Sequence, residues 1–171
     1  MEVILMTNEY QPIQEPELQI PLILPPKEAD TIESQQPELD TAVVTRIIDG
    51  DTIEVNLNGN TVDVRLLLID TPESVHPDQP VERYGLKASR FSEIYLIRKI
   101  VQLEYDGPRL DPYGRILAYL WVDGQNFNQI LLEEGLANIA YVFNPSYKYY
   151  DQFLRAQEKA KEERKGMWEW V

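Results

Sequence analysis

The sequence predicts an α+β fold that is mainly β: a small barrel of five short strands with three helices, in the order β-β-β-α-β-β-α-α. Three strand-like runs follow one another closely, a helical segment separates them from two further runs, and two helical segments end the chain. Five short strands with a helix after the third favour a closed barrel of the oligonucleotide-binding (OB) type. A five-stranded open sheet with helices on one face is the structural alternative.

The first three strands are predicted over residues 42–49, 51–57 and 61–69. In the second, Ile53, Val55 and Leu57 alternate with polar residues, as in a half-buried strand. Asn58-Gly59 is a strong two-residue hairpin signal before the third. These runs therefore form an antiparallel meander.

The remaining elements follow in order along the chain. A helix is predicted over about 81–98, strands over 99–105 and 115–123, and helices over 126–134 and 149–165. Gly135 and Gly166 are predicted to end the last two helices.

Net charge divides the chain into two parts. Residues 1–40 hold nine acids, one base and six of the twelve prolines, which predicts a disordered, acidic, proline-rich arm. Residues 41–171 form the predicted folded domain, with 20 acids and 15 bases. The total of −13 argues against a nucleic-acid partner unless specific residues supply the affinity.

Composition excludes several classes of site. The chain has no cysteine, so disulfides, thiolate metal sites and cysteine nucleophiles are excluded. No apolar stretch approaches the roughly 20 residues of a membrane span. The acidic start shows no signal peptide.

Two aspartates are predicted to converge on one end of the barrel. Asp51 shares its side of the second strand with Ile53, and Asp70 closes the third strand. With a backbone carbonyl at Thr71, they would suit a hard cation such as calcium. A single buried aspartate could simply accept hydrogen bonds in a turn, but two at one mouth favour the cation.

The third strand must bend if its charged residues serve one site. Arg65 and Asp70 are five residues apart, so in a straight strand they would face opposite sides. A bend or bulge near 68–69 is therefore expected, and Thr71-Pro72 would help to turn the chain.

Arg65, Arg115 and Glu73 complete a set that suits phosphoryl transfer. Two guanidinium groups can stabilise charge on a phosphorane, and a carboxylate can activate water. The arginines could instead only neutralise Asp51 or Asp70, and strand parity supports both readings equally.

Several linked motifs carry a family resemblance. They are VVTRIIDGDT (43–52), VRLLLIDTPES (64–74), HP and YG (76–77 and 84–85), DPYGRILAYLWVDG (111–124), EEGLANIAYV (133–142) and GMW (166–168). Over about residues 42–170 the chain resembles the staphylococcal nuclease (thermonuclease) family, whose fold is a five-stranded OB barrel with three helices.

The resemblance implies a role for each candidate residue. It implies a calcium site at Asp51, Asp70 and the carbonyl of Thr71. It implies catalytic roles for Arg65, Glu73 and Arg115. Tyr113, Tyr141 and Phe143 fall on substrate-binding positions. The implied reaction is calcium-dependent hydrolysis of single-stranded or denatured DNA and of RNA, with cleavage of the 5′ P–O bond to leave 3′-phosphates.

The departures from the family pattern lie in substrate binding. A lysine-rich loop of the family carries Asp78 and Gln79 here, Pro112 replaces a lysine, and Phe143 replaces a tyrosine. Phe143 can stack on a base but cannot hydrogen-bond to it. We expect weaker affinity and a shallower salt dependence, with the chemistry retained. His76, the single histidine, is expected to have a structural role in its loop.

A second class of function is a non-catalytic OB module that binds nucleic acid or protein. The complete catalytic set argues against it. The resemblance further favours a secreted, monomeric protein, although no signal peptide is visible.

Overall fold

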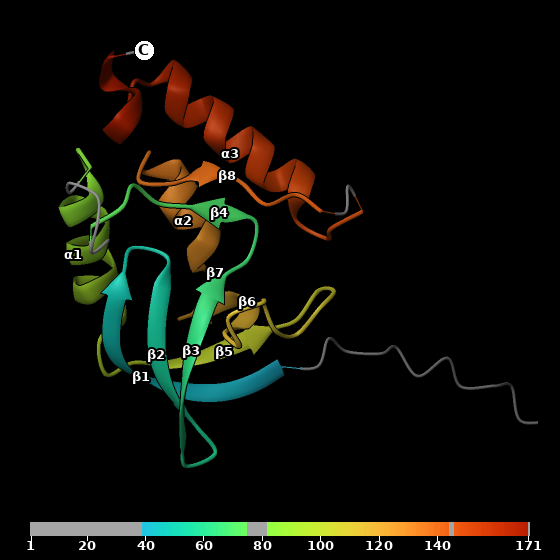
Figure 1. The fold of residues 1–171 in the computed structure, drawn as a ribbon. Helices are drawn as coiled ribbons and strands as arrows, with labels where there is room; N and C mark the ends of the chain where they lie inside the picture. The colour runs from blue at the N-terminus through green and yellow to red at the C-terminus, as the bar shows by residue number, and fades with distance from the viewer. Residues whose placement is uncertain (1–38, 75–81, 144–145, 171) are drawn as a thin grey trace, which may run out of the picture. The chain divides into compact units, whose positions relative to one another are not determined.

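The computed structural model describes residues 39–74, 82–143 and 146–170. Its long strands are β1 (Leu39–Asp49), β2 (Thr52–Leu57), β3 (Asn60–Leu66), β5 (Ile100–Glu104) and β6 (Ile116–Val122). The helices of these residues are α1 (Gly85–Leu96), α2 (Phe127–Glu133), α3 (Tyr150–Glu162) and a final 3₁₀ helix, η1 (Gly166–Trp170). The predicted order of strands and helices is confirmed (Figure 1). Within this part of the chain, no helix is long and apolar enough to cross a membrane.

The five long strands close into a barrel. Their order in the sheet is β3-β2-β1-β5-β6, and a parallel pairing of β3 with β6 joins the two edges, for example Val64 with Ile116. Two-residue strands β4 (Ile69–Asp70), β7 (Gln125–Asn126) and β8 (Asn138–Ile139) extend this frame. The predicted closed barrel is confirmed, and the open-sheet alternative is wrong.

β1 is longer than predicted because it pairs with two other strands, β5 and β2. Its first half pairs with β5, beginning at Leu39 opposite Glu104, and its second half pairs with β2. Register shifts between Val44 and Arg46, and between Ile47 and Asp49, mark bulges where the strand curves around the barrel. The predicted acidic arm, except for its last two residues, lies outside the described residues.

The third strand ends earlier than predicted. β3 stops at Leu66, and Leu68 takes the left-handed conformation, with φ of 65°. The chain then resumes in β4, which pairs with β8. The predicted end of the strand at residue 69 is therefore wrong, because β3 stops at Leu66, whereas the bend predicted near 68–69 is confirmed, at 67–68. Both Leu67 and Leu68 are buried, so packing holds this turn although leucine does not favour it.

Two glycines at the ends of helices pack against each other. Gly135 has φ of 64°, and the N–H of Leu136 reaches back to the Leu131 carbonyl, which is the predicted stop of α2. The prediction that Gly166 ends α3 is wrong, because α3 ends at Glu162 and Arg164 takes the left-handed conformation shortly after it. Gly166 serves a close approach instead: a Cβ there would lie 2.3 Å from the carbonyl oxygen of Gly135.

α1 begins at Gly85, after Tyr84, whose φ is 75°. A Cβ at Gly85 would lie 2.4 Å from the carbonyl oxygen of Glu73, so only glycine allows the helix to pack this closely on that segment. The buried side of α1 includes Ala88 and Leu96. Ile94 of the same helix is exposed.

Candidate functional site

Asp51 faces inward at the turn that joins β1 to β2. Its side chain is buried, with the whole residue 5% exposed. One carboxylate oxygen accepts the Thr71 N–H at 2.6 Å and the Thr71 hydroxyl at 3.0 Å, and the other accepts the Thr52 hydroxyl at 3.1 Å. These bonds fix the start of β2 against the residues that follow β4.

Arg65 lies between the two aspartates. Its guanidinium is 3.2 Å from the Asp51 carboxylate and 2.7 Å from that of Asp70. It also donates to the carbonyls of Ile69 at 2.9 Å and Leu66 at 3.2 Å. The turn at 67–68 makes this possible, because it brings Asp70 back to the side of β3 on which Arg65 lies.

The two carboxylates together carry more negative charge than Arg65 neutralises. Burial raises the pKa of Asp51, and the Arg65 guanidinium and the Thr71 N–H offset this only in part. Burial and then the charge on Asp51 raise the pKa of Asp70, again with only partial compensation from Arg65. A further cation would therefore stabilise the ionised pair.

The donors at this end of the barrel are hard oxygen ligands. Asp51 and Asp70 converge, and Thr71 is hydrogen-bonded to Asp51. In the described ranges no group of three or more His, Cys, Asp or Glu side chains forms a metal cluster. Two carboxylates with a backbone carbonyl suit calcium, which completes its shell with water. They do not suit a soft metal.

Glu73 follows Asp70 on the segment that α1 packs against. The Glu73 carbonyl accepts the Glu82 N–H at 2.8 Å, and the Glu73 N–H donates to the Glu82 carboxylate at 3.1 Å. The charge on Glu73 also contributes to the raised pKa of Asp70, after burial and the charge on Asp51.

Arg115 is held in a turn rather than in the barrel. Its Nε donates to the Asp111 carboxylate at 2.6 Å, and the second Asp111 oxygen accepts the backbone N–H groups of Tyr113 and Arg115, each at 2.9 Å. No ion pair within the described residues joins Arg115 to Asp51 or Asp70. Leu117 of β6 pairs with Arg65, and Arg115 lies in the turn directly before β6, two residues from that pairing.

Arg65 and Arg115 each lie next to an exposed aromatic ring. The Arg65 guanidinium is 5.4 Å from the centre of the Tyr141 ring, and that of Arg115 is 5.4 Å from the Tyr113 ring. Phe143, which is 81% exposed, lies beside Tyr141 with ring centres 6.4 Å apart. Large apolar rings that stay exposed next to buried charge are typical of a ligand-binding surface.

A serine cluster that sequence reasoning missed supports the Asp51 turn. The Asp49 carboxylate accepts the hydroxyls of Ser74 at 2.5 Å and Ser89 at 2.9 Å, and Ser92 donates to the Gly50 carbonyl at 2.7 Å. Serines three residues apart on the inner side of α1 were the available signal. The cluster ties α1 to the turn that carries Asp51.

Three residues that the sequence singled out, His76, Asp78 and Gln79, lie outside the described residues. Pro112 is described and lies exposed at the tip of the Arg115 turn.

The chain was compared with known proteins. Residues 63–170 match a family model described as "Staphylococcal nuclease homologue". The SPbeta prophage-derived endonuclease YokF of Bacillus subtilis is 47% identical over 132 residues, which are 77% of this chain and 45% of that protein. Endonuclease YncB of the same species is 45% identical, over 78% of this chain and 64% of its own length. The thermonuclease of Staphylococcus hyicus is 43% identical, over 75% of each chain.

The closed barrel with its three helices defines an OB-type domain, and the match extends over most of it. The chain belongs to the staphylococcal nuclease family. It spans only 45% and 64% of the lengths of the two Bacillus relatives.

Proposed function

We propose that this chain is a calcium-dependent nuclease that hydrolyses phosphodiester bonds of DNA and RNA. The observation that carries the proposal is Arg65, which bridges Asp51 and Asp70 beneath the exposed Tyr141 ring. These contacts support a cation site, a phosphate-binding guanidinium and a surface for a base at one end of the barrel. The relatives named as endonucleases and thermonuclease support the same activity.

Each candidate residue has its own role in the hydrolysis of one phosphodiester bond. Asp51, Asp70 and the Thr71 carbonyl would hold calcium, which supplies charge neutralisation for the phosphate when it is bound. Glu73 accepts the proton of a water molecule whose oxygen attacks phosphorus. The P–O5′ bond breaks, the 5′-oxygen takes a proton from solvent, and the phosphate stays on the 3′-oxygen. Arg65 binds the phosphate, and Arg115 stabilises the charge that develops on it.

Tyr113, Tyr141 and Phe143 bind the nucleotide. Their exposed rings can stack on a base whatever its identity, which suits single-stranded or denatured substrates. Duplex DNA offers no unstacked base to such rings, so we expect slower cleavage of it.

A nuclease assay with an end-group analysis tests the proposal. Heat-denatured DNA and RNA are incubated with calcium, with excess chelator, and with calcium restored. We expect cleavage only with calcium, and DNA products that a polymerase extends only after phosphatase treatment, because their 3′-ends are phosphorylated. Undiminished cleavage in chelator would remove the metal, and 3′-hydroxyl ends would overturn the assigned bond.

Matched variants test the residues. Glu73→Gln should lower turnover by about a hundredfold or more, whereas Asp63→Asn, the same charge change at an exposed position of β3, should not. Calcium alone should raise the unfolding temperature of the parent protein but not of Asp51→Asn. Tight binding of nucleic acid without turnover in calcium would instead favour the non-catalytic module.

A further inference from the structure

The chain has one short segment of concentrated positive charge beside the candidate site. Residues 83–90 include three bases and no acid, although the whole chain carries a net charge of −13. These bases are Arg83, Lys87 and Arg90, and all three are exposed. Lys87 and Arg90 are three residues apart in α1, so they lie on neighbouring turns of the same helix face.

Aromatic rings lie against two of these bases, Arg83 and Lys87. The Tyr84 ring lies 5.5 Å from the Arg83 guanidinium and 4.6 Å from the Lys87 ammonium. Trp170 of η1, far from Arg83 in the sequence, also contacts it, with 5.2 Å between the guanidinium and the ring centre. Trp170 is 68% exposed. We call the five residues Arg83, Tyr84, Lys87, Arg90 and Trp170 the α1 basic face. Figure 1 shows η1 next to the N-terminal end of α1.

Two acids that adjoin this face, Glu82 and Glu169, are already hydrogen-bonded within the protein. The Glu169 carboxylate accepts the Tyr84 hydroxyl at 2.7 Å. The Glu82 carboxylate accepts the Glu73 N–H at 3.1 Å. Among the described residues neither of these two acids forms an ion pair with Arg83, Lys87 or Arg90, so neither competes with another anion for the three bases.

The start of the α1 basic face lies against the segment that carries Glu73. The N–H of Glu82, the residue before Arg83, donates to the Glu73 carbonyl, and Gly85 packs on the same carbonyl. A polymer that is cut beside Glu73 therefore has α1 as its immediate neighbour.

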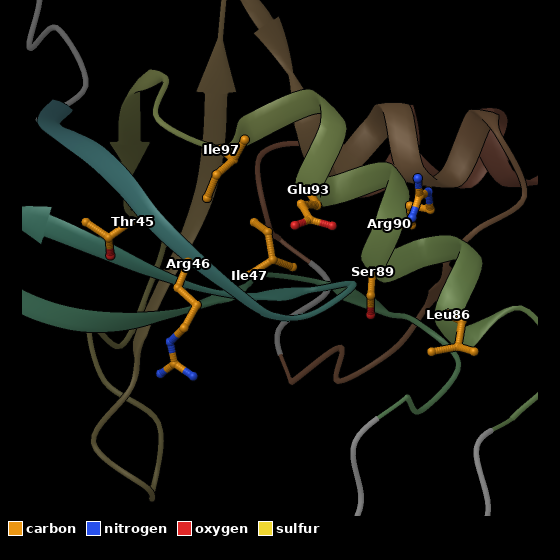
Figure 2. A pocket seen from close by; sticks show the side chains of 8 residues that line it. All are labelled: Thr45, Arg46, Ile47, Leu86, Ser89, Arg90, Glu93 and Ile97. Atoms are coloured by element: carbon orange, nitrogen blue, oxygen red, sulfur yellow. The ribbon is translucent and has the colours of Figure 1, made fainter.

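A groove continues the α1 basic face along the barrel. Figure 2 shows it between α1 and β1, with Arg90 on the helix wall and Arg46 on the strand wall. Its volume is about 660 Å³, and Ile47, Leu86 and Ile97 give it an apolar lining. Arg46 is already paired with the Glu54 carboxylate at 2.9 Å, and Glu93 also lines the groove. The anionic part of a ligand is therefore expected at Arg90, with its apolar part beside it.

We propose that the α1 basic face and this groove bind the single strand of nucleic acid that flanks the cleaved bond. The proposal rests on the proposed nuclease function and assigns a second contact surface to it. It also answers the objection raised by the net charge, because phosphate affinity would come from α1 rather than from the loop that carries Asp78 and Gln79.

The contacts suit a single-stranded polyanion. A ring over the face of a guanidinium restrains the group but leaves its N–H edge free for a phosphate oxygen. The exposed Trp170 ring can stack on a base of any identity. The alternation of bases and rings matches the alternation of phosphates and nucleobases along an unpaired strand.

The test compares a neutralised variant with a matched control. The test variant is Arg83→Gln with Lys87→Gln and Arg90→Gln. The control removes the same charge from α3, by Arg155→Gln with Lys159→Gln and Lys161→Gln. Binding and cleavage are measured for a dinucleotide and for a single strand of about twelve nucleotides, over a range of salt concentrations.

We expect the test variant to bind the longer strand about tenfold more weakly at low salt, and its salt slope to fall by about 2, since each lost phosphate contact removes about 0.7. Its ratio of kcat/KM for the longer strand over the dinucleotide should fall by the same factor. The α3 control should change this ratio by less than about twofold. Trp170→Ala should weaken binding of the longer strand about fivefold without changing the salt slope.

The outcomes separate this surface from the proposed function. A parent protein that cleaves no nucleic acid would overturn the proposed function itself. Cleavage by the parent with an unchanged test variant, or with equal losses in test and control, would overturn only the α1 basic face. Arg83→Lys with Arg90→Lys should retain affinity for the longer strand; a loss as large as in the glutamine variant, at an unchanged unfolding temperature, would also overturn it.

Discussion

Arg65 and Arg115 are the same residue type in two different environments. Arg65 lies in the barrel mouth, its side chain 10% exposed, with two carboxylates and two carbonyls around it. Arg115 lies in a surface turn, its side chain 31% exposed, and its ion pair is with Asp111 through Nε. The buried arginine is therefore part of both the fold and the site, whereas the exposed one can be changed with little cost to folding.

Arg65→Gln should produce the largest effect. Without the guanidinium, Asp51 and Asp70 face each other in a partly buried site, which should lower the free energy of unfolding by about 3 kcal/mol. Activity should fall about a thousandfold, because phosphate stabilisation is also lost. Urea unfolding in chelator and a nuclease assay in calcium measure the two effects.

A double variant checks the cause of the lost stability. Arg65→Gln with Asp51→Asn should recover part of the unfolding free energy, because it removes the uncompensated charge, but no activity. If the double variant is as unstable as Arg65→Gln alone, lost packing rather than charge explains the effect.

Arg115→Gln should separate activity from stability. We expect activity to fall about a hundredfold, while the free energy of unfolding changes by only about 1 kcal/mol, because the Arg115 side of this ion pair is partly exposed and the Asp111 carboxylate keeps two backbone N–H donors. The same urea unfolding curves and nuclease assay apply. A loss of stability equal to that of Arg65→Gln would show that the two environments do not differ as described.

The sequence predicted the element order, the hairpins and the bend before Asp70. The bend followed from strand parity, since Arg65 and Asp70 could share a site only if β3 was interrupted. Its exact form did not follow, because Leu68 in a left-handed conformation is stabilised by buried neighbours and not by its own preference. The contact of Arg83 with Trp170 could not be predicted from the sequence either, because it joins residues far apart in the chain.

Asp111→Asn should have a smaller effect that depends on pH. Burial acts to raise the pKa of Asp111, but hydrogen bonds from the Arg115 N–H and side chain and from the Tyr113 N–H outweigh it and lower the pKa. The folded pKa then lies below the unfolded one, so the stabilisation is complete above about pH 4 and is lost as the pH falls through the folded value.

We therefore expect Asp111→Asn to lower the unfolding free energy by about 1 kcal/mol at neutral pH and to converge with the parent protein in acid. Activity should fall about tenfold, because Arg115 loses its orientation. Urea unfolding across pH measures the first effect, and a stability difference that persists unchanged in acid would contradict the role of the ionised carboxylate.

Phe143→Tyr should have the smallest effect, and it addresses the exposed side of the comparison. Phe143 is 81% exposed, so an added hydroxyl meets water and should leave the free energy of unfolding unchanged. The hydroxyl can hydrogen-bond to the substrate beside Tyr141, which should lower KM for single-stranded DNA by about threefold with kcat unchanged. Phe143→Leu, which removes the ring, should raise KM instead. Steady-state kinetics on single-stranded DNA distinguish these results. A change in kcat rather than KM would mean that this ring contacts the reacting phosphate more directly than its position beside Tyr141 indicates.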